Sequence, residues 1–159
     1  MKHIVHEIAP IYNADSRILI LGTMPSPASR EQGFYYGHPQ NRFWQVISAA
    51  LSMPLPATID QKKQLLLQHR IALWDVLNSC AIEGASDNSI TNPICNDFKP
   101  IFETAEIRAV YTTGQPATKL YKRLVGKSSI YLPSTSPANC AFSFDKLLNA
   151  YSAILKYIA

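Results

Sequence analysis

The sequence is poor in cysteine and has no long apolar run. Its three cysteines, Cys80, Cys95 and Cys140, are too few and too scattered for a disulfide framework, and the chain has no CxxC motif. We therefore expect no structural zinc or iron–sulfur cluster. No stretch reaches the roughly 20 apolar residues that span a bilayer, and residues 1–17 lack the apolar core of a secretory signal. These absences favour a soluble intracellular protein without a metal or organic cofactor.

Three motifs that mark common nucleotide-binding and hydrolytic sites are also missing. No GxGxxG fingerprint follows the first apolar run, which removes support for a dinucleotide-binding fold. No GxxxxGK[ST] loop is present to cradle the phosphates of a nucleoside triphosphate. No GxSxG turn is present to expose a nucleophilic serine.

The overall composition is that of a globular protein. The 159 residues suit one compact domain, residues 1–159, and 47% of them are hydrophobic. The net charge of +4 permits an anionic partner but does not identify one.

Apolar runs alternate with helical patterns along the chain. Strands are expected at residues 16–22, 71–77, 107–114 and 128–134. Helices are expected at residues 41–51, 58–70, 97–103, 115–125 and 144–158. Residues 23–40, with three prolines, are predicted to be mostly loop, and residues 78–93 an irregular functional loop or lid.

This alternation predicts an α/β fold, a single three-layer α/β/α domain with a central, mainly four-stranded parallel sheet. In such sheets ligands bind outside the carboxyl ends of the strands. Three of the loops expected there contain residues 23–40, 113–116 and 133–139. They are rich in amides, hydroxyls, prolines and aromatic rings, which suits a flat base with hydrogen-bonding edges.

Two of these loops contain Ser/Pro turns, "MPSPAS" at 24–29 and "PSTSPAN" at 133–139. Hydroxyls and exposed backbone N–H groups in such turns can hold phosphate oxygens without carrying charge. The same residues also form ordinary turns that cap helices.

The motifs "GTMPS", "YYGHPQNRFW", "LWDVLNSC" and "PSTSPAN" occur in this order, and together they resemble the uracil-DNA glycosylase superfamily. The resemblance runs from about Arg17 to the final helix. It is closest to the hypoxanthine-DNA (deoxyinosine) glycosylase branch, and HPxNRFW is also similar to the mismatch-specific uracil glycosylases. Met24 stands where the superfamily's first motif has its catalytic asparagine.

The resemblance implies an enzyme that flips a deaminated base, above all hypoxanthine, out of duplex DNA and hydrolyses its N-glycosidic bond. It carries the catalytic role to Asn41, at the end of "HPQN". The amide oxygen of Asn41 can orient a water and its nitrogen can donate to the departing base, although an amide is no general base. Asparagine is also a good helix cap, and the two roles can coexist.

Asp75 is the second catalytic candidate, because a carboxylate at a strand end can activate water. It can equally be a buried acceptor that holds two loops together. The expected base pocket consists of Thr23, Met24, Tyr35, Tyr36, His38 and Thr113. One of the two tyrosines should stack on the base while the other belongs to the core. His38 either donates to a purine carbonyl or is a buried, satisfied histidine.

The expected DNA contacts are Pro25, Ser26, Ser134, Ser136, Pro137 and Asn139. The resemblance implies that Pro137, Ala138 or Asn139 enters the base stack in place of the flipped nucleotide, and Asn139 could read the orphaned base. Arg42 could reach a phosphate or a core carboxylate. Asp87 and Asn88 could contact DNA or close over the base.

The expected partner is double-stranded DNA with a deaminated base, acted on by a monomer in the cytoplasm, at the nucleoid. A uracil or mismatch-specific glycosylase is the alternative within the superfamily. A non-catalytic nucleic-acid-binding module is the alternative outside enzymology, because the first-motif asparagine is missing.

Overall fold

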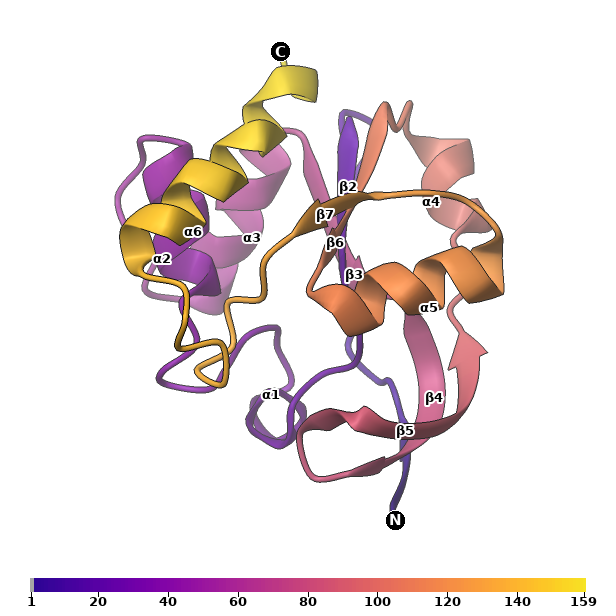
Figure 1. Cartoon of the computed structure of the whole chain (residues 1–159). Coiled ribbons are helices and arrows are strands. Elements are labelled where there is room, and N and C mark those ends of the chain that lie inside the picture. Colours follow the sequence, from indigo (N-terminus) through magenta and orange to yellow (C-terminus); the bar gives the residue numbers. More distant parts are fainter. Residues whose placement is uncertain (1) are drawn as a thin grey trace.

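A four-stranded parallel sheet forms the centre of the protein in the computed structural model, which describes residues 2–159. Its strands stand in the order β3 (Ile71–Asp75), β2 (Ile18–Gly22), β6 (Ala109–Thr113) and β7 (Ile130–Leu132). Each neighbouring pair is parallel, so the four carboxyl ends meet at one edge. The sheet and its helices (Figure 1) confirm the predicted fold class.

Strand β2 is buried along its whole length because both faces of the sheet are covered. Ile18 and Ile20 belong to one hydrophobic cluster, whereas Leu19 and Leu21 belong to the other. Alternate side chains of a strand point to opposite faces, so this continuous apolar run separates two cores. Each such buried side chain stabilises the fold by about 1.5–3 kcal/mol.

Two layers of helices cover the sheet (Figure 1). One layer contains α2 (Phe43–Ala50), α3 (Ile59–Gln68), α6 (Phe144–Tyr151) and the 3-10 helix η1 (Ser152–Tyr157). The other contains α4 (Lys99–Thr104) and α5 (Gln115–Val125). The first layer contributes Phe43 and Tyr151 to one cluster, and the second contributes Ile101 and Tyr121 to the other. No helix within residues 2–159 is long and apolar enough to cross a membrane.

A second, antiparallel sheet corrects the prediction for residues 78–93. These residues are not an irregular loop: they form most of a hairpin of β4 (Leu77–Glu83) and β5 (Ser86–Cys95), with β1 (Lys2–Val5) on its other side. The polar sequence hid the hairpin, because β5 gains its strand structure from pairing with β4 rather than from an apolar face. The hairpin begins two residues after β3 ends and therefore stands beside the carboxyl edge of the parallel sheet.

The segment 23–40 also contains a short helix that was predicted as loop, α1 (Pro27–Gln32). Ser26 caps it by accepting the backbone N–H of Ser29, and Pro27 occupies the first helical position. Gly33 ends it in the left-handed conformation, with φ 72°.

Candidate active site

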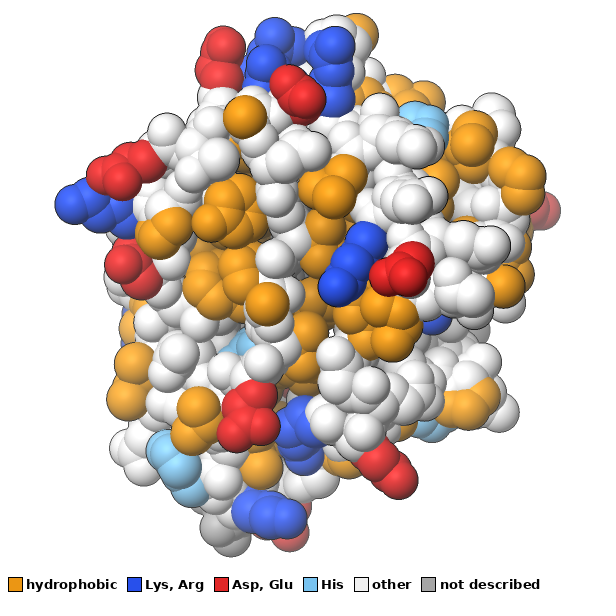
Figure 2. All heavy atoms as spheres, turned by 180° about the vertical axis from the view of Figure 1, so that it is seen from behind, with side chains coloured by type: hydrophobic (Ala, Val, Ile, Leu, Met, Phe, Trp, Pro, Cys, Tyr) orange, Lys and Arg blue, Asp and Glu red, His pale blue; other side chains and the backbone are white. Residues whose placement is uncertain are grey.

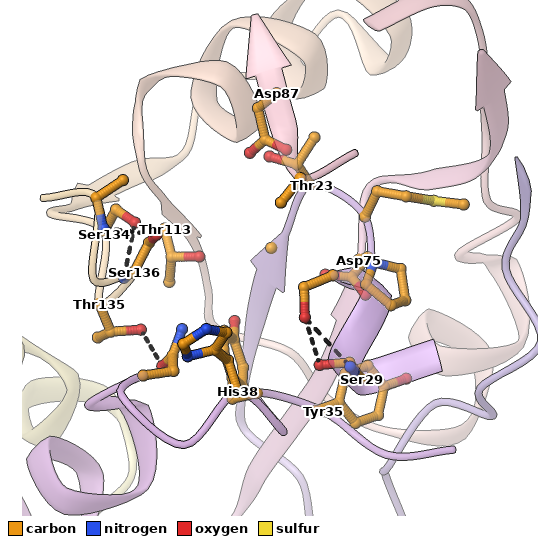
Figure 3. A pocket seen from close by; sticks show the side chains of 18 of the residues that line it. Thr23, Ser29, Tyr35, His38, Asp75, Asp87, Thr113, Ser134, Thr135 and Ser136 are labelled. Atoms are coloured by element: carbon orange, nitrogen blue, oxygen red, sulfur yellow. Dashed lines mark hydrogen bonds between the residues drawn. The ribbon is translucent and has the colours of Figure 1, made fainter. Parts of the chain in front are cut away.

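A cavity of about 300 Å³ opens at the carboxyl edge of the parallel sheet. The ends of three strands border it, with Gly22 and Thr23 after β2, Asp75 from β3 and Thr113 from β6. The loop after β7, helix α1 and the β4–β5 hairpin complete the wall (Figure 3). The sequence-predicted residues that line it are Thr23, Met24, Pro25, Ser26, Tyr35, Tyr36, His38, Asn41, Asp75, Thr113, Ser134, Ser136 and Pro137. Asn139 is the one predicted site residue outside this lining.

Asn41 lines the cavity. Its Oδ1 accepts the backbone N–H of Phe43 at 2.9 Å and the Thr135 hydroxyl at 2.9 Å. The backbone N–H needs an oxygen as acceptor, so it fixes the orientation of the amide. With two donors on Oδ1, this oxygen is not free to orient a water as the sequence had suggested. Within residues 2–159 the Nδ2 group has no hydrogen-bond partner, so it is available to a ligand.

Asp75 is buried at the end of β3, and its Oδ2 lies 2.8 Å from Nε2 of His6. The Nδ1 of His6 accepts the backbone N–H of Ile8 at 3.2 Å. The hydrogen of a neutral His6 ring therefore stands on Nε2, which donates to the carboxylate. Asp75 is thus a buried acceptor that holds the N-terminal segment through His6, and it also borders the cavity, while its role toward water stays a prediction. Its Oδ1 points toward Gly22, where an added Cβ would collide with it.

The two tyrosines have different environments. Tyr35 is a core residue, 2% exposed, whose hydroxyl donates to the Ala9 carbonyl at 2.8 Å. Tyr36 stacks on Phe43 with ring centroids 3.8 Å apart and planes 11° from parallel. Its φ of 54° lies in the left-handed region, which is uncommon for a bulky residue and occurs at functional sites. Tyr36 is therefore the aromatic candidate for contact with a base.

The Tyr36 hydroxyl is buried at the floor of the cavity and has no partner of good hydrogen-bond geometry among the described residues. Burial raises its pKa, with a smaller contribution from the charge of Asp75, while the nearby Thr113 hydroxyl opposes the shift. The phenol is therefore neutral at physiological pH and can donate to a ligand.

His38 lies on the exposed rim of the cavity, so the alternative of a buried, satisfied histidine is wrong. Its Nδ1 accepts the backbone N–H of Gln40 at 3.1 Å. A neutral ring then carries its hydrogen on Nε2, which is free to donate.

The serines of the two Ser/Pro turns make local hydrogen bonds. Ser134 Oγ accepts the N–H of Ser136, and Ser136 Oγ accepts the N–H of Ala138. This is the ordinary turn role, and it shapes the loop so that Pro137 and Ala138 form its exposed tip. The turn of Ser134 and Ser136 stands on one side of the cavity, and α1 with its Ser/Pro turn stands on another (Figure 3).

Arg42 joins the two main site loops. Its guanidinium donates to the carbonyl oxygens of Phe142 at 2.7 Å and Asn139 at 3.2 Å, and its backbone N–H donates to that of Thr135 at 3.2 Å. The core-carboxylate alternative for Arg42 is therefore wrong. Asn139 is also engaged, because its Nδ2 donates to the Ser134 carbonyl. These contacts place Asn139 within the loop's own scaffold rather than in the cavity.

Asp87 is the ionisable side chain that the predicted base pocket did not include. It reaches the cavity from β5, and Figure 3 shows it beside Thr23, across the cavity from His38. Burial raises the pKa of its carboxyl to about 6, and the charge of Asp75 adds to this, while a hydrogen bond with Thr23 opposes it. From the sequence, Asp87 and Asn88 lay in a predicted polar loop and could contact DNA or close over the base. The strand pairing that brings Asp87 to the cavity depends on tertiary structure.

Metal binding is not indicated by the side chains. Among residues 2–159, no three His, Cys, Asp or Glu side chains gather into a group that could hold an ion.

The fold and the cavity agree with one family of known proteins. The sequence pattern of the uracil DNA glycosylase superfamily matches residues 9–158. The chain therefore belongs to this superfamily, as the motifs had implied.

Individual members of the superfamily show which of its proteins this chain resembles. A hypoxanthine DNA glycosylase of Methanosarcina acetivorans is 35% identical over 140 residues, which cover 86% of this chain and 89% of the relative. A protein of the same name from Methanosarcina barkeri is 30% identical and covers 82% and 85% of the two chains. A solution NMR structure from M. acetivorans, described as a candidate uracil DNA glycosylase, superposes with a TM-score of 0.82 at 29% identity over 99% of both chains.

Proposed function

We propose that this protein is a monofunctional DNA glycosylase that flips hypoxanthine out of double-stranded DNA and hydrolyses its N-glycosidic bond. The observation that carries the proposal is that Asn41, whose Nδ2 has no partner among the described residues, lines the same cavity as Asp75. Two relatives that span most of the chain are named hypoxanthine DNA glycosylase. A cavity of about 300 Å³ is at the small end of ligand pockets, which suits one base.

The proposed roles follow from the geometry. A flipped base lies against Tyr36, whose position Phe43 supports by stacking. Asn41 Nδ2 donates to the base and stabilises the charge that grows on it as the bond breaks. Asp75 orients the attacking water and stabilises the positive charge on the sugar. Within the described chain the cavity lining contains no lysine, which agrees with water rather than an amine as the nucleophile.

The turns of Ser26, Ser134 and Ser136 are proposed to hold the DNA backbone, and Pro137 with Ala138 to fill the gap in the base stack. We further propose that residues 1–159 form a single glycosylase domain acting as a monomer on chromosomal DNA in the cytoplasm.

A base-release assay tests the function. A labelled duplex with one deoxyinosine is incubated with the protein and treated with alkali, which breaks the strand wherever a base has been lost. We expect breaks at inosine with the natural protein. Asn41→Ala and Asn41→Asp should each slow release by about 10²-fold or more, because both remove the amide donor. Gln40→Ala, on the exposed neighbour, should leave the rate unchanged.

The two Asn41 variants separate catalysis from folding. Asn41→Asp keeps an oxygen for Phe43 and Thr135, so its melting temperature should stay near that of the natural protein. Asn41→Ala also loses the two hydrogen bonds that Oδ1 accepts, at about 1–3 kcal/mol. Full activity of Asn41→Asp would contradict the assigned role. No release from inosine, uracil or xanthine duplexes would overturn the glycosylase function and leave a DNA-binding module.

Uracil is the second candidate substrate, because the solved structure with the same fold is described as a candidate uracil DNA glycosylase. Inosine, uracil and xanthine duplexes competing in one reaction rank the three bases directly. Faster release of uracil than of hypoxanthine would reassign the substrate within the same reaction class.

A further inference from the structure

We propose that Asp87 is the proton donor to the departing purine, a role that makes it specific for hypoxanthine over uracil. The inference rests on the proposed glycosylase function and deepens it. Asp87 is supplied by the antiparallel hairpin rather than by the parallel sheet that carries Asp75.

The position of Asp87 is fixed by the hairpin. Glu83 pairs with Ser86 at the turn between β4 and β5. Ser89 Oγ accepts the N–H of Glu83 at 2.8 Å and donates to the Ser86 carbonyl at 2.6 Å. The turn is therefore held on both sides of Asp87, and the half-buried carboxyl lines the cavity beside Thr23 (Figure 3).

The surroundings of Asp87 favour its protonated form. Asp75, from the end of β3, is a like charge that raises the pKa, and burial is the larger cause. The other titratable groups of the cavity are the neutral phenols Tyr35 and Tyr36 and, on the rim, His38. Among the described residues no Lys or Arg forms an ion pair with Asp87. A base that fills the cavity displaces water and raises the pKa of about 6 further, so the acid is protonated near neutral pH.

Asp75 and Asp87 then form an acid–base pair with divided roles. The C1′–N9 bond breaks and its electron pair goes to the purine, while the Asp87 proton passes to an unsubstituted ring nitrogen. A water oxygen bonds to C1′, and the proton it loses goes to the Asp75 carboxylate. The products are free hypoxanthine and the abasic sugar, and the two carboxyls exchange the proton back through solvent.

The specificity follows from the leaving groups. Hypoxanthine has unsubstituted ring nitrogens with lone pairs that accept a proton. Uracil has none, and it departs as an anion whose charge is spread over its two carbonyl oxygens. An acid in the pocket therefore accelerates purine release more than pyrimidine release.

Stability gives independent information on Asp87. Its pKa is higher in the folded chain than the ordinary 3.8, so the folded state holds the proton more tightly, and stability is lost as pH rises from about 4 to about 6. Asp87→Asn removes this loss. Its melting temperature at pH 8 should equal or exceed that of the natural protein, which shows that the variant folds.

The test is single-turnover release of hypoxanthine and uracil across pH 5 to pH 9. The natural protein, Asp87→Asn and Asp87→Ser are compared, with Ser86→Ala on the same hairpin as control. We expect hypoxanthine release by the natural protein to fall about tenfold per pH unit above the pKa of Asp87 in the complex. In both Asp87 variants the rate of hypoxanthine release at low pH, where it no longer depends on pH, should be lower by about 10²-fold or more. The decrease in rate at alkaline pH should be absent from both variants. Their loss on uracil should be less than about tenfold, and Ser86→Ala should match the natural protein.

Two results would overturn the inference in different ways. The proton-donor role of Asp87 would be contradicted if hypoxanthine release by Asp87→Asn still decreased at alkaline pH. It would also be contradicted if the Asp87 variants slowed the release of hypoxanthine and uracil equally. In both cases the proposed glycosylase function would stand. Absence of hypoxanthine release by the natural protein at every pH would overturn the proposed function and this inference together.

Discussion

At the end of β2, Gly22 leaves the space that Asp75 occupies. A Cβ on Gly22 would collide with Asp75 Oδ1 and stand 3.2 Å from the Tyr36 hydroxyl. Asp75 is 4% exposed and held by His6 at 2.8 Å, so it has no room to withdraw. The glycine therefore sets how closely the carboxylate and the phenol approach the cavity.

Gly22→Ala should displace the Asp75 carboxylate, because the added methyl group collides with it. We expect base release to fall by about 10²-fold, because small displacements of positioned groups have effects of that size. The free energy of unfolding should fall by about 1–3 kcal/mol from overpacking. Single-turnover release and urea denaturation measure the two effects. An unchanged release rate would show that the position of Asp75 is not critical.

The sequence predicted which residues lie around the cavity better than it predicted their hydrogen-bond partners. Asn41, Asp75 and Ser134 could be placed at one edge, because each follows or ends a predicted parallel strand or lies in the loop beyond one. The second partner of the Asn41 Oδ1 could not be predicted, since it is the hydroxyl of Thr135, which is 94 residues distant. The catalytic roles themselves remain predictions.

Among the elements, the loop after β7 and the start of α2 behave as one unit. Arg42 holds them together through the carbonyl oxygens of Asn139 and Phe142. The planar guanidinium holds several donors in a fixed geometry, which suits two separated carbonyls better than the single ammonium group of a lysine does.

Arg42→Lys should therefore loosen the loop while keeping the charge. We expect a stability loss of about 1–3 kcal/mol and a decrease in release of about tenfold, because the tie to the loop is lost. Arg123→Lys, exposed on α5, is the matched control. If Arg42 acted on a DNA phosphate instead, Arg42→Ala would reduce the salt slope of binding by about 1; an unchanged slope supports the positioning role.

The prediction of helices and strands failed for the β4–β5 hairpin, where strand pairing rather than an apolar sequence pattern determines the structure. The apolar run of β2 and the helical spacing of α2 are visible in the sequence, and both elements are confirmed. The hairpin was missed because β5 alternates only between exposed and half-buried positions. This failure also explains why Asp87 was absent from the predicted base pocket.

At the scale of the whole molecule, charge is dispersed. On the face in Figure 2, a small group of Lys and Arg side chains lies at the top, the others are scattered, and several lie next to acidic ones. The net charge is +4, and the described cavity lining contains no Lys or Arg. Hydroxyls and backbone groups therefore supply much of the proposed DNA contact.

Binding to DNA should consequently depend only moderately on salt. Each phosphate neutralised by a cation contributes about −0.9 to the slope of log K against log salt. We expect a slope between about −1 and about −3, measured by fluorescence anisotropy of a labelled duplex. A slope steeper than about −6 would reveal a cationic DNA surface that this account does not include.

The hydrogen bond between Thr135 and Asn41 bears on how the protein is made. A nascent chain that has formed α2 already has the Phe43 N–H that orients the Asn41 amide, but it still lacks the Thr135 hydroxyl that is the second partner of Oδ1. Tyr151, whose hydroxyl donates to the Pro133 carbonyl at 2.7 Å, secures the same turn from further along the chain. The wall of the cavity that contains Asn41 is therefore completed only after the residues around Thr135 and Tyr151 have been synthesised and have folded onto it.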